Sequence, residues 1–143
     1  MIGHDPILWA HAVSTCMLAG LIWFVQIVHY PLFAQVGPDV FARYERAHQR
    51  RTTLVVAPLM LTELACALSL VFGPPPVAPA WAPPAGLAMV ALIWVSTATV
   101  QVPLHRRLEH GWSARAHRAL VASNWGRTLL WTLRSILAIA LLA

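Results

Sequence analysis

Four long apolar stretches fill most of this sequence and constrain its fold more than any motif does. Each stretch provides the roughly 20 residues that a helix needs to cross a hydrocarbon core of about 30 Å. Only 10% of the residues are charged, whereas soluble domains average about 25%. The sequence therefore predicts an all-α integral membrane four-helix bundle that forms one domain over residues 1–143. The predicted membrane spans are residues 7–30, 52–73, 81–101 and 119–143.

All ten basic residues are arginines, and eight of them lie in the two segments that follow the first and third apolar stretches. Four occur within residues 43–51, and four occur within residues 106–118. Basic residues near the ends of membrane helices mark the cytoplasmic side. We therefore expect the bacterial inner membrane, with both segments in the cytoplasm. The two termini and the proline-rich loop of residues 74–84 are expected on the periplasmic side.

The lipid bilayer is the expected partner of these arginines. A net charge of +5 is also found in nucleic-acid-binding proteins, but here the arginines adjoin membrane helices and no recognition motif accompanies them. We therefore expect no nucleic-acid partner. The first six residues contain Asp5 but no arginine or lysine, so a cleaved signal peptide is not expected.

Prolines and capping residues predict where the helices end. Pro31 should close the first helix, because its ring cannot continue a helix without a kink. Asp39 is the predicted N-cap of a helix that begins on the cytoplasmic surface and continues into the second span. The third helix should descend to Pro103, followed by a partly helical loop. One face of the surface helix is predicted to carry Phe41, Tyr44, His48 and Arg51.

Three ionisable residues are predicted at membrane depth, where a charged side chain is costly and tends to face the bundle interior. The helical rise places Glu63 roughly 16 Å from the cytoplasmic edge, and Arg127 and Arg134 roughly 12 and 22 Å along the last helix. Glu63 needs a partner there, so we expect an ion pair with one arginine, which can be purely structural. The other arginine is in excess, and it meets either polar groups of the chain or an anionic or carbonyl-bearing ligand.

Polar residues recur at helical spacing along three of the predicted helices and should face the interior. In the last helix the opposite side, with Leu129, Leu133, Ile136 and Leu137, suits lipid. The polar stripes together predict a cavity that opens toward the cytoplasm. Trp94 and Trp131 either wall a pocket for a flat lipophilic molecule or pack as ordinary core residues. The stripes are Asn124, Arg127, Thr128, Trp131 and Arg134 in the last helix, His11, Thr15, Ile22, Gln26 and His29 in the first, and Trp94, Thr97, Gln101 and His105 in the third.

Four histidines, one for each helix, are predicted at the cytoplasmic end of the bundle. Imidazole binds metal ions and haem iron, so a single metal ion or a haem is one interpretation of this cluster, although no metal site is assigned. The other interpretation is that the rings lie at the water interface and hydrogen-bond to loops and lipid phosphates. The four residues are His29, His48, His105 and His117.

The start of the last apolar stretch carries a short motif, Ser123-Asn124-Trp125-Gly126-Arg127-Thr128. It resembles the Asn-x-x-Arg-Thr ending of the anthrone-oxygenase-like family of small four-helix membrane proteins. A proline directly after the first helix is a second point of resemblance to that family. The resemblance implies oxygen-dependent oxidation of a polycyclic aromatic substrate without an obvious cofactor. It also implies that Asn124 and Arg127 lie near the substrate.

Two functions are compatible with these patterns. The first is a membrane oxidoreductase or oxygenase-like enzyme for a lipophilic substrate, in which Arg127 orients an oxygen-bearing group and Asn124 assists by hydrogen bonding. In this reading His29 or His48 moves protons. The second is a non-enzymatic membrane subunit or small transporter with a structural cluster of glutamate and arginine. Candidate substrate-binding residues are Glu63, Arg134, Trp94, Trp131, Gln101 and Tyr44.

Overall fold

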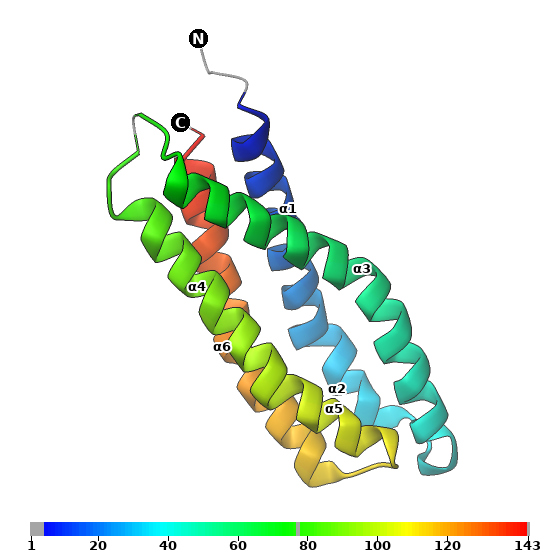
Figure 1. Ribbon diagram of the computed structural model, residues 1–143. Coiled ribbons are helices and arrows are strands. Elements are labelled where there is room, and N and C mark those ends of the chain that lie inside the picture. Colours follow the sequence, from blue (N-terminus) through cyan, green and yellow to red (C-terminus); the bar gives the residue numbers. More distant parts are fainter. Residues whose placement is uncertain (1–4, 77, 143) are drawn as a thin grey trace.

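The chain folds into a bundle of four helical rods, in agreement with the predicted all-α fold (Figure 1). The computed structural model describes residues 5–76 and 78–142. The first rod comprises α1 (Pro6–Phe24), the π-helical η1 (Val25–His29), α2 (Tyr30–Leu32) and the 3-10 helix η2 (Phe33–Gln35). The second rod is α3 (Pro38–Phe72). The third comprises α4 (Ala82–Ser96), the π-helical η3 (Thr97–Gln101) and α5 (Val102–Glu109), and the fourth is α6 (Ala114–Ala140).

The four rods pack as a ring around a shared interior. α1 packs against α3 and α6, and α4 packs against the same two helices. α5 continues the line of the third rod and also contacts α3 and α6. Each rod therefore turns one face toward its neighbours and leaves the opposite face exposed, so a polar stripe on the inward face is enclosed by the other rods.

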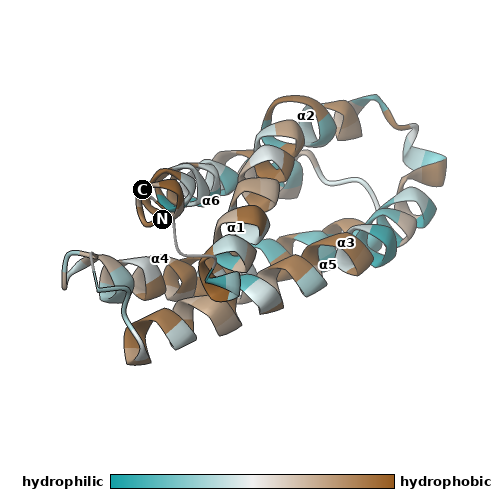
Figure 2. Cartoon of the chain, turned by 90° about the horizontal axis from the view of Figure 1, so that it is seen from above, coloured by the Kyte–Doolittle hydropathy of each residue, from teal (hydrophilic) through white to brown (hydrophobic). Residues whose placement is uncertain are grey.

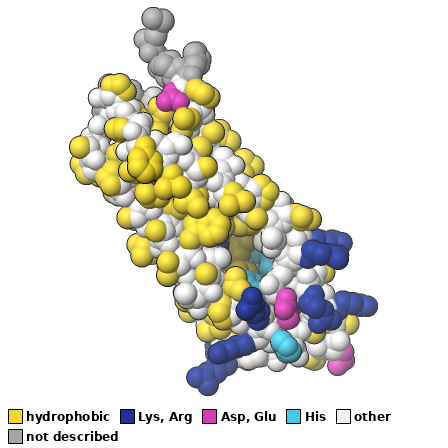
Figure 3. Space-filling model, viewed as in Figure 1, with side chains coloured by type: hydrophobic (Ala, Val, Ile, Leu, Met, Phe, Trp, Pro, Cys, Tyr) yellow, Lys and Arg dark blue, Asp and Glu magenta, His cyan; other side chains and the backbone are white. Residues whose placement is uncertain are grey.

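The face of the bundle seen in Figure 3 is apolar over most of its length. Phe72 is 86% exposed and Ile136 is 61% exposed, and apolar patches of this kind mark surfaces that contact a membrane or another protein. Three continuous helices, Pro6–Gln35, Pro38–Phe72 and Ala82–Glu109, are long and apolar enough to cross a membrane. Within the described part of the chain α6 is not among them, and it carries two buried arginines. The apolar helices indicate a membrane protein.

The two arginine-rich segments lie at the same end of the bundle, which we call the arginine-rich end. They are the start of α3 and the region where α5 ends and α6 begins, and their side chains form the blue cluster in Figure 3. α1 begins and α6 ends at the opposite end (Figure 1). Hydrophilic residues are likewise concentrated near the start of α3 (Figure 2). The side of the membrane on which each end lies stays a prediction.

Two prolines do not end helices, which corrects the sequence-based expectation. The first rod continues beyond Pro31 as α2 and η2, and the third continues beyond Pro103 as α5. A π-helical segment, η1 or η3, precedes each proline, and the backbone N–H that follows each segment donates to the carbonyl five residues back. This widened turn accommodates a residue that lacks an N–H and whose ring crowds the preceding turn. The predicted end at residue 101 is the last residue of η3, and the predicted end at residue 30 directly follows η1.

The start of α3 also differs from the prediction. The N-cap is Gly37, Pro38 occupies the first turn, and Asp39 lies inside the helix. Glu45 is buried whereas Arg51 is exposed, so the inward face runs through Glu45 and not through Arg51. The predicted extension of the second membrane helix from the arginine-rich end is present, because α3 is one continuous helix.

Candidate functional site

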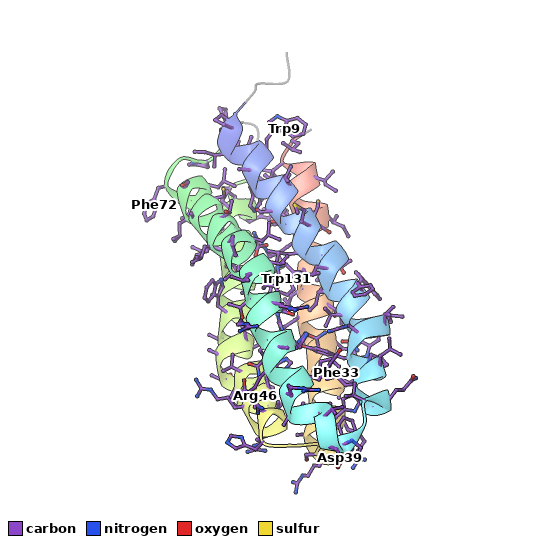
Figure 4. All side chains as sticks on the ribbon, turned by 90° about the vertical axis from the view of Figure 1, so that its right-hand side faces the viewer. Trp9, Phe33, Asp39, Arg46, Phe72 and Trp131 are labelled. Carbon is purple, nitrogen blue, oxygen red and sulfur yellow. The ribbon has the colours of Figure 1, made fainter. Side chains whose placement is uncertain are left out.

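A cavity of about 250 Å³ lies inside the half of the bundle that is nearer the arginine-rich end. Residues from all four rods line it, and Figure 3 shows a hollow with histidine atoms on its wall just beside the arginine cluster. Trp131, which forms part of the wall, lies at mid-height in the bundle (Figure 4). The apolar wall includes Leu18, Ile22, Val56, Met60, Trp94 and Trp131, and the polar wall includes Tyr30, His48, Thr97, Gln101, His105 and Arg127.

α6 contributes a charged side chain, Arg127, to this wall. Its side chain is 7% exposed, and its guanidinium carbon lies 5.0 Å from the ring centroid of Trp131, within cation–π range. Its Nη1 donates to Asn124 Oδ1 at 3.3 Å, and its Nε has no hydrogen-bond partner among the described residues. No carboxylate in the described ranges lies within ion-pair distance of it. The predicted surplus arginine is therefore Arg127.

Asn124 positions Arg127 from behind the cavity wall. It is fully buried, and its Nδ2 donates to Gln26 Oε1 at 2.8 Å, which leaves its own Oδ1 facing Arg127. Gln26 in turn donates from Nε2 to the Val121 carbonyl at 3.2 Å. Asn124 is not part of the cavity wall, so the role that its position supports is to hold the guanidinium rather than to touch a ligand.

The second buried arginine has a full set of partners toward the other end of the bundle. Arg134 Nε donates to Glu63 Oε1 at 2.8 Å, and Arg134 Nη2 donates to His11 Nε2 at 2.8 Å. Arg134 Nη1 donates to the carbonyl of Gly86. Glu63 also accepts from Thr15 Oγ1 and from Trp131 Nε1, both at 3.1 Å. The expected ion pair of Glu63 is confirmed with Arg134, and we call these side chains the Glu63–Arg134 cluster.

Three hydrogen-bonded side chains reach the cavity from the end that lies opposite the Glu63–Arg134 cluster. Tyr30 Oη lies 2.9 Å from His105 Nε2, and His105 Nδ1 lies 2.5 Å from Glu45 Oε1. Glu45 is fully buried, and Gln49 Nε2 donates both to it, at 3.3 Å, and to Glu109 Oε1, at 2.7 Å. Tyr30 and His105 both line the cavity. This chain, which we call the Tyr30–His105–Glu45 unit, joins the first three rods.

Backbone geometry fixes the position of Tyr30. It follows the π-helical segment η1 directly, and its N–H donates to the Val25 carbonyl. Its own carbonyl accepts a hydrogen bond from His117 Nε2 at 2.7 Å. π-helical turns occur frequently at functional sites because they re-aim the side chains around them. The second such turn, η3, ends at Gln101, which also lines the cavity.

The four predicted histidines do not form one cluster. His29 Nε2 and His48 Nδ1 are hydrogen-bonded at 2.9 Å, and the ring centroids of His48 and His105 lie 5.6 Å apart. His117 instead packs against Trp112, with ring centroids 4.9 Å apart. Across residues 5–76 and 78–142, no three His, Cys, Asp or Glu side chains are grouped closely enough to hold a metal ion.

The structure brings about half of the predicted site residues to one place. Arg127, His48, Trp94, Trp131 and Gln101 all line the cavity. The remaining candidates lie elsewhere: His29 supports His48, Asn124 holds Arg127, Glu63 and Arg134 form the separate cluster, and Tyr44 packs against Phe33 with ring centroids 5.6 Å apart.

Sequence reasoning missed Tyr30 and Glu45 as site residues. Hydropathy predicts Tyr30 only as the end of a helix, although the proline after it is the signal for a disturbed turn that re-aims the preceding side chain. Glu45 shares a helix face with Phe41 and His48, spaced by four and three residues, and an acid on an otherwise inward face indicates a buried partner.

The donors that remain free define what this site can bind. Arg127 Nε and Trp94 Nε1 are both buried without a partner within the described ranges, and both residues belong to the cavity wall. Unsatisfied buried donors are costly, so the cavity suits a molecule that brings acceptor oxygens. No family model, curated protein or solved structure matches this chain, so the site itself is the basis for a functional conclusion.

Proposed function

We propose that this chain is a membrane enzyme of oxidoreductase or oxygenase type, which binds a lipophilic, oxygen-bearing molecule in the cavity. The observation that carries the proposal is Arg127, a buried cation on the cavity wall with no carboxylate partner among the described residues. A buried charge without a partner is strongly unfavourable. An anionic or carbonyl oxygen of a ligand would satisfy it and would be stabilised as negative charge develops during a reaction.

The size and the wall of the cavity favour a small, flat, apolar molecule. Its volume of about 250 Å³ is slightly below the roughly 300–1,000 Å³ that is usual for ligand pockets. Trp94 and Trp131 provide flat apolar surfaces, and Leu18, Ile22 and Met60 complete them. A ligand of one or two fused rings with an oxygen directed at Arg127 meets both properties.

The alternative is a non-enzymatic membrane subunit or small transporter. A structural role explains the Glu63–Arg134 cluster well, because every partner there belongs to the chain itself. A structural role does not explain the cavity or the Arg127 Nε that lacks a hydrogen-bond partner among the described residues. We therefore favour the enzyme, in which an oxidation of the bound molecule by oxygen follows its orientation by Arg127.

Binding of β-naphthol and naphthalene to the full chain in detergent or nanodiscs tests the proposal. The two probes share a ring system and differ by one hydroxyl, so their difference in affinity reports the oxygen contact. We expect β-naphthol to bind more tightly to the wild type, and Arg127→Leu to weaken it by about 10- to 100-fold while leaving naphthalene binding unchanged. Arg118→Leu, at an exposed arginine of α6, is the matched control.

Equal affinities of the wild type for the two probes would contradict the proposal, as would an unchanged affinity of Arg127→Leu for β-naphthol. Catalysis is tested separately by following oxygen uptake with the same probe. Uptake that requires wild-type Arg127 supports an oxygenase, whereas binding without any turnover of a panel of hydroxylated aromatic probes supports the alternative.

A further inference from the structure

We propose that the Tyr30–His105–Glu45 unit is the general base of the cavity, and that Tyr30 takes a proton from a bound hydroxyl or enolisable ligand. This inference rests on the proposed function, because it assigns the acid–base chemistry of the same cavity. It also narrows the substrate class to molecules with an acidic O–H or C–H next to the oxygen that Arg127 binds.

The protonation of the unit follows from its hydrogen bonds. A carboxylate only accepts hydrogen bonds, so the bond between His105 and Glu45 places a proton on His105 Nδ1. In a neutral imidazole the other nitrogen is then an acceptor, and Tyr30 Oη–H donates to His105 Nε2 across 2.9 Å. One lone pair of the Tyr30 oxygen faces the Arg127 guanidinium, and the other remains available to a ligand.

The proton transfer balances within the unit. A ligand O–H or C–H bond breaks, its proton bonds to Tyr30 Oη, and the original Tyr30 proton moves to His105 Nε2. The imidazolium that forms lies 2.5 Å from the Glu45 carboxylate, which compensates its charge. The electron pair stays on the ligand as a phenolate or enolate, and the guanidinium of Arg127 in the same cavity compensates that charge. No proton leaves the protein in this step.

Three features show that the geometry is built for more than packing. Glu45 is fully buried at the arginine-rich end, where an exposed position would avoid its desolvation cost. Gln49 Nε2 donates to the same Glu45 oxygen that His105 contacts, and it also joins Glu45 to Glu109. The nearest other titratable ring is His48, which is itself hydrogen-bonded to His29 and Thr52 Oγ1, so His105 has only Tyr30 and Glu45 as hydrogen-bond partners in the described ranges.

The ionisation state of bound β-naphthol tests the inference, at a pH at which the free probe is almost entirely protonated. We expect the naphtholate absorption band to appear on binding to the wild type. We also expect titration calorimetry in buffers of different ionisation enthalpy to give the same heat, because the proton remains on the protein. Tyr30→Phe should lose the band while retaining binding within about tenfold. Tyr44→Phe, at the chain's other tyrosine, is the matched control.

The possible results separate the two proposals. Binding of protonated β-naphthol, release of a proton to buffer, or a naphtholate band that persists in Tyr30→Phe would overturn the general-base assignment and leave the binding proposal intact. Absence of binding would overturn the proposed function. In that case the tautomer of His105 tests the general-base assignment by itself. ¹⁵N-histidine NMR should show the proton on Nδ1, and Tyr30→Phe should shift the Nε2 signal alone. A proton on Nε2 would overturn the assignment.

Discussion

Arg127 and Arg134 lie two helical turns apart on the same face of α6, and their surroundings are opposite. Arg134 uses Nε, Nη1 and Nη2 in hydrogen bonds to Glu63, Gly86 and His11. Arg127 has one weak bond to Asn124, lies beside the Tyr30 hydroxyl, and keeps a free Nε next to the cavity. Both are buried in an apolar bundle. The comparison shows that a buried charge by itself does not indicate function, and that the presence or absence of partners separates a structural arginine from a candidate binding residue.

The largest expected effect comes from breaking the ion pair. Arg134→Leu leaves Glu63 as a buried carboxylate without its cation, which should lower the free energy of unfolding by about 3–5 kcal/mol. Arg127→Leu removes a charge that has no carboxylate partner in the described structure, so it should change stability by less than about 1 kcal/mol or increase it. Thermal and denaturant unfolding in one detergent compare the two variants. Equal destabilisation would remove the distinction between the two arginines.

A smaller effect should arise where α4 approaches the cluster. A Cβ added at Gly86 would lie 3.2 Å from Arg134 Nη1, and that guanidinium cannot move away because Glu63 and His11 hold it. Gly86→Ala should therefore cost about 1–3 kcal/mol in crowding, partly offset by a gain of about 0.5–1 kcal/mol in helix propensity. Gly126→Ala on α6, where no atom lies within 4 Å of an added Cβ, is the control and should be neutral or stabilising. A Gly86→Ala variant as stable as that control would show that the cluster can shift.

The smallest effect should appear at the second free donor of the cavity. Trp94→Phe removes the buried N–H that has no partner in the described ranges but keeps an aromatic wall. The unliganded protein should be equally stable or slightly more stable, because an unsatisfied donor is lost. Binding of β-naphthol should weaken by about 2- to 10-fold, as measured by calorimetry. A loss of stability without any loss of affinity would place Trp94 with the packing residues and not with the binding donors.

Much of the architecture could be predicted from hydropathy and spacing. The inward stripe of the last helix is correct at all five positions, each of which is buried. On the side predicted to face lipid, Leu129, Leu133 and Ile136 are exposed, whereas Leu137 is half-buried beside Gly86 of α4. Periodicity works here because α6 is a regular helix throughout. Periodicity failed at the start of α3, where the inward face includes Glu45. The residues there are mostly polar, so too few apolar side chains mark which face of the helix is buried.

Pairing between helices was harder to predict than the stripes themselves. The rise per residue placed Glu63 between the two arginines in depth and left both as possible partners. The rotation and the vertical offset of α3 relative to α6 cannot be derived from residue numbers. These two quantities decide that Glu63 pairs with Arg134. The Tyr30–His105–Glu45 unit was missed for a related reason, since it brings together three residues that are up to 75 positions apart and depends on a π-helical turn.

Composition and arginine placement alone determined an all-helical bundle with one arginine-rich end and one buried arginine in excess of the available acid. These properties follow from the free-energy cost of exposing apolar groups to water and of leaving charges without partners. Residue types and their spacing are enough to predict where that cost arises. Tertiary packing decided which arginine is satisfied, where the cavity lies and which tyrosine reaches it, because hydrogen bonds between rods depend on offsets of a few ångströms that no single helix specifies.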